Sequence, residues 1–120
     1  MGTAIRFLAR LILVVEVVLG VLFWTGHGSS LVLVHIAIGV LLVLALWAAA
    51  LLARQRGAPI PLLWLAFLWG LLLPVFGLTQ TQIAVGGGHW VVQVLHLAAG
   101  VIAVGLVEML TRMGVRPQSP

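Results

Sequence analysis

The sequence contains no cysteine, and only 7% of its 120 residues are charged. The absence of cysteine excludes disulfide bonds and metal sites built from thiolates. The scarcity of charge excludes an ordinary soluble domain, because a soluble chain of this size needs far more polar surface. Hydrophobic residues make up 63% of the chain, and the mean hydropathy is +1.30. We therefore expect lipid to be the solvent for most of these side chains.

The few basic residues are all arginines, and they give the chain a net charge of +4. A basic balance can indicate nucleic-acid binding, but here it indicates orientation, because the arginines stand at the ends of apolar runs. If the chain crosses a membrane four times, all of them fall on one side. The positive-inside rule then places both termini and the central loop in the cytoplasm, as expected for a multi-pass protein of a prokaryotic plasma membrane. The six are Arg6, Arg10, Arg54, Arg56, Arg112 and Arg116.

The apolar runs predict an all-α membrane protein with one domain, because each run has about the 20 residues that a membrane-spanning helix needs. A cleaved signal peptide is not expected, since Glu16 interrupts the first run and no small-residue cleavage site follows it. The tail from Gly114 is expected to be disordered. The four predicted helices cover about residues 4–24, 30–54, 61–78 and 89–113.

Two segments of the chain resemble each other. Residues 34–40 and 95–101 both contain a histidine followed four residues later by a glycine, and a loop of glycine and histidine precedes each. The second and fourth helices therefore look equivalent. This repeat predicts a bundle made of two similar helical hairpins.

His35 and His96 are the residues that point most clearly to chemistry. Each lies inside an apolar helix, where a polar side chain is costly and usually functional. Both helices run inward from the outer side, so the two imidazoles are expected at one depth. Gly39 and Gly100 lie one turn further along the same helix faces and would leave space for a flat macrocycle.

Two facing histidines with adjacent glycines suit a single haem b ligated by two imidazoles in a helical bundle. The alternative is that the two histidines are hydrogen-bonded across a helix interface. Zinc is less favoured, because it takes more ligands and neither cysteine nor a pair of carboxylates is at hand.

Three further polar residues could take part. His27 and His89 lie at the outer water interface, about 10–12 Å above the inner pair. They could hold a second haem, which is the less favoured reading, or contact haem propionates or a substrate, or be solvated. Glu16 is expected at the depth of the inner histidines and is a candidate catalytic acid, or else a protonated side chain bonded to a neighbouring helix. Glu108 is expected to pair with Arg112 and carries no predicted chemistry.

Four helices, with a histidine in the second and another in the fourth, resemble one half of a haem A synthase, and small b-type membrane cytochromes in general. The resemblance implies that the helix-two and helix-four histidines hold haem, and that a chain with only one half works as a homo-oligomer. The catalytic half of that family carries a glutamate one turn before the helix-two histidine, where this chain has Leu31 and Val32. Many members also have a cysteine pair in an outer loop. This chain is therefore more similar to the half that holds haem.

The sequence thus leads to three hypotheses. The first is a haem b-binding membrane cytochrome that transfers electrons near the outer leaflet, with quinol or a redox protein as partner. The second is a compact haem A synthase-like oxidoreductase that oxidises a bound haem. The third is an accessory subunit of a membrane complex without a cofactor.

Overall fold

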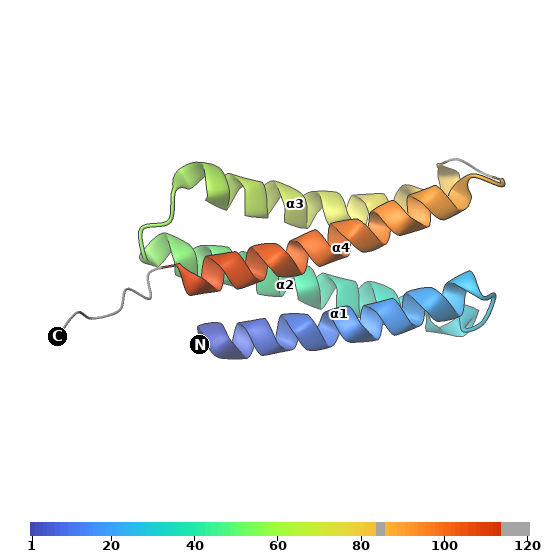
Figure 1. The fold of residues 1–120 in the computed structure, drawn as a ribbon, viewed down its shortest axis with the longest axis horizontal. Coiled ribbons are helices and arrows are strands. Elements are labelled where there is room, and N and C mark those ends of the chain that lie inside the picture. Colours follow the sequence, from blue (N-terminus) through green and yellow to red (C-terminus); the bar gives the residue numbers. More distant parts are fainter. Residues whose placement is uncertain (84–85, 114–120) are drawn as a thin grey trace.

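The computed structural model describes residues 1–83 and 86–113 of the chain. Four long helices follow one another in antiparallel order, as Figure 1 shows, and short connections join them. Single turns of 3-10 helix, η1 (Ser29–Leu31) and η2 (Gln80–Gln82), stand at the outer loops. The long helices are α1 (Gly2–Trp24), α2 (Val32–Gln55), α3 (Ile60–Thr79) and α4 (His89–Arg112).

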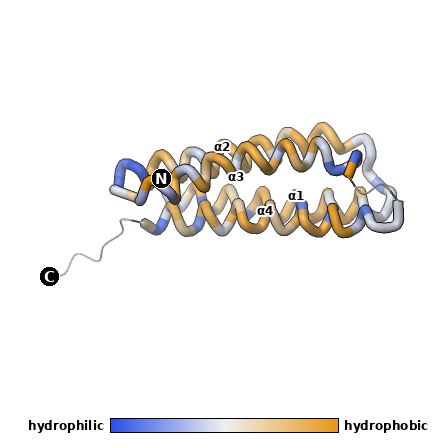
Figure 2. Tube along the Cα trace, turned by 90° about the horizontal axis from the view of Figure 1, so that it is seen from above, coloured by the Kyte–Doolittle hydropathy of each residue, from blue (hydrophilic) through white to orange (hydrophobic). Residues whose placement is uncertain are grey.

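All four long helices are long and apolar enough to cross a membrane. The prediction of an all-α, four-helix membrane bundle is confirmed, and the predicted helix boundaries agree with the structure to within two residues. In Figure 2 the hydrophobic colour runs along the helices, and most of the hydrophilic residues lie toward the two ends of the bundle. The predicted disorder of the tail from Gly114, and Arg116 with it, lie outside the described residues.

The two ends of the bundle differ in charge. One end, here named the inner end, holds the start of α1, the α2–α3 turn and the end of α4 (Figure 1). Every described arginine lies toward this end, which agrees with the arrangement expected from the sequence. The other end, the outer end, holds the connections α1–α2 and α3–α4.

Backbone geometry explains the turns at both ends. Gly57 has φ +81° and reverses the chain between α2 and α3, a conformation that only glycine adopts without strain. Gly28 has φ +79° and leads into η1. The α2 helix begins directly after this 3-10 turn, and no side chain caps its first residues.

The α2 and α4 helices contact each other and each of the other two helices. Burial is concentrated toward the inner end: in α2 the first buried residue is Leu42, and most buried residues of α4 follow Ala99. Toward the outer end the α1–α2 hairpin and the α3–α4 hairpin draw apart in Figure 1. The outer half of the bundle is therefore the less tightly packed half.

Two tryptophans tie α3 to its neighbours. The Trp69 indole Nε1 donates a hydrogen bond of 3.0 Å to the Ala99 carbonyl oxygen on α4. Trp47 of α2 stacks on Phe67 with ring centroids 5.3 Å apart and lies directly against Gly70, which has no side chain to block it. Small residues that admit large neighbours are the usual means by which membrane helices pack closely.

Candidate functional site

His35 and His96 meet in the outer half of the bundle. His35 is in the first turn of α2, and His96 is two turns into α4. Their ring centroids are 6.1 Å apart, and the ring planes are inclined at 68°. The two imidazoles thus come from different helices and lie at one depth, as the repeated segments predict.

Glu16 of α1 contacts the same pair. Its Oε2 atom lies against Nδ1 of His35. Only 13% of the Glu16 side chain and 23% of the His35 side chain are exposed. The expected depth of Glu16 therefore agrees with the structure, and its partner is specifically the helix-two histidine.

Aromatic rings and a glycine surround the two imidazoles. Phe23 of α1 lies edge-on to His35 at 5.4 Å between centroids, and Phe76 of α3 lies edge-on to His96 at 5.7 Å. A Cβ atom added at Gly77 would stand 3.0 Å from Cε1 of His96, so the imidazole packs directly on the α3 backbone. We name these six residues from all four helices the histidine cluster: Glu16, Phe23, His35, Phe76, Gly77 and His96.

Phe23, Phe76 and Gly77 were not identified by sequence reasoning. Phenylalanine and glycine are common in membrane helices, and the third helix carries no repeat of the H-x-x-x-G segment. Depth along the helices gave no clear signal either, because Phe23 is next to the last residue of α1 whereas His96 is two turns into α4.

Three buried polar atoms of the cluster form no hydrogen bond with the described residues: Nδ1 of His96, Oε1 of Glu16, and Nδ1 of His35, which has only its ion-pair contact with Glu16. A buried polar atom without a partner is costly, and more so in a membrane. A bound cofactor, ion or proton would supply what these atoms lack. These atoms are the polar groups of the cluster that a bound group could contact.

The two glycines that were predicted to leave space for a macrocycle, Gly39 and Gly100, have free space beside them. A Cβ added at Gly39 or at Gly100 would meet no other heavy atom within 4 Å. Space of this kind beside a ligand histidine is what a flat macrocycle requires. The glycine that touches a histidine, however, is Gly77.

The outer histidines are held by their own loops. His27 is exposed, and its Nδ1 lies 3.2 Å from Oγ1 of Thr25. His89 is half-buried, and its Nδ1 lies 3.3 Å from the carbonyl oxygen of Ile83. The hydrogen-bond partners of His27 and His89 are local, whereas the side chains that contact His35 and His96 come from other helices.

The number of possible ligand side chains in the cluster distinguishes between zinc and haem. Within residues 1–83 and 86–113, no group of three or more His, Cys, Asp or Glu side chains gathers to hold a metal ion. A zinc ion bound by protein takes three or four such ligands. Haem brings the four nitrogens of its ring and needs only axial ligands from the protein.

The spacing of the rings is also compatible with haem. Metal–imidazole bonds are about 2 Å long, so two rings on opposite sides of one ion have centroids about 6 Å apart. This spacing would hold for any metal ion bound between the two rings, so the small number of protein ligands is what separates haem from zinc.

Comparison with models of protein families, with curated proteins and with solved structures finds no match to this chain. The resemblance to haem A synthases and b-type cytochromes stays a prediction that rests on the two histidines and their setting.

Proposed function

We propose that this chain is a haem b-binding membrane cytochrome in which His35 and His96 are the two axial ligands. The observation that supports this most directly is the meeting of two imidazoles from α2 and α4 at 6.1 Å, inside the membrane-spanning part of the bundle. The open glycines one turn further along both helices support it further. One haem per four-helix unit is proposed.

Five residues of the histidine cluster have a role in this proposal. Haem, when bound, supplies reversible one-electron chemistry. His35 and His96 would hold it, and Glu16, which contacts Nδ1 of His35, would set the orientation and tautomer of that ring. Phe23 and Phe76 pack against the imidazoles and keep water from them.

The depth of the cluster suggests where electrons would be exchanged. His35 and His96 lie in the half of the bundle that faces the outer end, so a partner would be met near the outer leaflet. Quinol dissolved in the bilayer, or a redox protein docking at that surface, has access to this position. The location that we propose is the plasma membrane of a prokaryote, with the arginine-rich end in the cytoplasm.

The second candidate, a compact haem A synthase-like enzyme, is favoured by one observation. The family resemblance implies a catalytic glutamate close to the helix-two histidine, and this chain lacks it at residues 31–32. Glu16 reaches the same histidine from α1. It would then act as a catalytic acid or base beside the bound haem, instead of only orienting His35.

Spectroscopy of the purified protein in detergent distinguishes these candidates. A Soret band with a six-coordinate, low-spin spectrum is expected. Haem extraction with mass analysis should give haem b from a cytochrome, and hydroxylated or formylated haem from a synthase. A protein that shows no Soret band, even after haem is added back, would leave the accessory-subunit hypothesis, in which the histidine cluster is a structural contact between helices.

Substitution of the histidines tests the ligand assignment. His35→Ala or His96→Ala should abolish the six-coordinate low-spin spectrum. The matched variants His27→Ala and His89→Ala remove the same side chain at the outer end and should leave it in place. Loss of the spectrum in the outer variants alone would move the haem to the membrane surface.

A further inference from the structure

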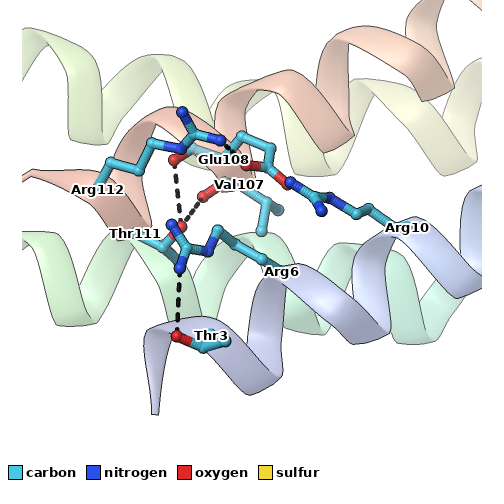
Figure 3. Close-up of polar contacts among 7 residues, drawn as sticks. All are labelled: Thr3, Arg6, Arg10, Val107, Glu108, Thr111 and Arg112. Atoms are coloured by element: carbon cyan, nitrogen blue, oxygen red, sulfur yellow. Dashed lines mark hydrogen bonds and ion pairs between the residues drawn. The ribbon is translucent and has the colours of Figure 1, made fainter.

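A second candidate binding site lies at the opposite end of the bundle and is independent of haem. Glu108 of α4 binds two arginines: its Oε1 accepts a hydrogen bond of 2.6 Å from Nε of Arg10, and its Oε2 accepts one of 3.0 Å from Nη2 of Arg112 (Figure 3). The sequence predicted the pair with Arg112. The link to Arg10 joins α4 to α1 and appears only in the folded bundle.

Charge at this end is not balanced. Arg6 and Arg56 lie close to the same network, and their hydrogen bonds go to neutral groups: Oγ1 of Thr3, and the carbonyl oxygens of Thr111 and Met113. Among the described residues, Glu108 is thus the one acidic side chain beside four arginines, and it binds two of them, Arg10 and Arg112. A positive field of this kind, at a membrane surface, attracts anions.

These arginines line two open grooves on the surface of the bundle. The first, of about 550 Å³, runs between α1 and α4, with Arg10, Glu108 and Arg112 at one end and the apolar residues Leu13, Val101 and Val104 along its walls. The second, of about 480 Å³, is lined in part by Arg6, Arg56 and Arg112. Arg112 lies between the two and contributes to both.

The arginine heads remain accessible although they are paired. The side chains of Arg10 and Arg112 are 60% and 64% exposed. Arginine can offer several N–H groups in a planar fork, so each can bind a carboxylate and a phosphate oxygen at once.

We infer that the α1–α4 groove binds the phosphate of an anionic phospholipid of the inner leaflet, with an acyl chain along its apolar wall. The groove continues from the arginines into the membrane-spanning part of α1 and α4. An occupant must therefore be anionic at one end and apolar along its length. A free phosphate lacks the apolar part, and a zwitterionic lipid lacks the net negative charge.

Lipid titration followed by native mass spectrometry tests this inference. The purified full-length chain, freed of lipid in a neutral detergent, is titrated with phosphatidylglycerol or with phosphatidylcholine of the same acyl chains. Phosphatidylglycerol should bind more tightly. Arg10→Gln and Arg112→Gln should each weaken it about fivefold, the effect of one cation near a membrane surface. Equal binding of the two lipids, or displacement by inorganic phosphate alone, would overturn the assignment.

Two control variants make the test specific. Arg54→Gln removes the same charge from the last turn of α2, but among the described residues Arg54 lines neither groove. It should leave the affinity unchanged, and a loss equal to that of Arg10→Gln would mean only general charge attraction. Glu108→Gln removes the opposing charge and should strengthen phosphatidylglycerol binding about fivefold. A gain cannot come from misfolding, and a loss in this variant would contradict the inference.

Discussion

Glu16 of α1 and His35 of α2 contact each other across the first hairpin, inside the membrane-spanning part of the chain. A carboxylate in that position is costly unless it has a partner. A carboxylate that accepts a hydrogen bond from one nitrogen of an imidazole leaves the other nitrogen free to bind a metal. The contact with His35 therefore offsets the cost of burying the Glu16 carboxylate in the membrane. It also restrains the orientation of the His35 ring.

The role of Glu16 can be tested with two substitutions. Glu16→Ala should lower haem affinity about 10- to 100-fold, the range found when a partner behind a ligand histidine is removed. Glu16→Gln keeps an oxygen that can accept the hydrogen bond from Nδ1 of His35 and should retain haem. Haem content per protein and the low-spin spectrum are the measurements. Normal haem in Glu16→Ala would show that Glu16 does not orient His35.

The glycines of the site should separate folding from haem binding. In Gly39→Leu and Gly100→Leu the new Cβ atom would contact no other part of the protein, so the bundle should fold and keep its melting temperature. Both should lose haem, because leucine would fill the space proposed for the macrocycle. Gly105→Leu, equally open but nearer the inner end of α4, is the control and should keep haem. Full haem content in the first two variants would mean that the macrocycle lies elsewhere.

Gly70, unlike Gly39 and Gly100, should be required for the stability of the folded bundle. A Cβ at this position would collide with the Trp47 indole, so Gly70→Ala should destabilise the bundle by about 1–3 kcal/mol, as overpacking does. Trp47→Phe shortens the ring and should recover much of that loss in the double variant, since the two sites are in contact. Thermal unfolding in detergent measures both. Additive effects of the two substitutions would contradict this packing.

The orientation of the chain is open to labelling, because there is no cysteine to remove. Gln55→Cys places a single thiol at the inner end of α2, and Ser30→Cys places one in the outer connection. We prefer Gln55 to Gly57, whose φ of +81° a side chain would strain. In intact cells a membrane-impermeant maleimide should label the Ser30 variant and spare the Gln55 variant. The opposite labelling would reverse the topology.

The sequence alone determined the four spans, the arginine-rich end and the common depth of His35 and His96. These are local properties: the length of an apolar run sets a helix, charge collects at its ends, and residue number along a helix gives depth at 1.5 Å per residue.

Only the tertiary structure decided which side chains meet at a given depth. The pairing of Glu16 with His35, the contact of Gly77 with His96 and the link from Arg10 to Glu108 all depend on how each helix is rotated about its axis. A helix such as α3, apolar on every side, does not encode that rotation, since lipid and protein interior are equally apolar surroundings. The rotation is set by packing between helices, where Trp47 fits against Gly70 and Trp69 bonds to Ala99.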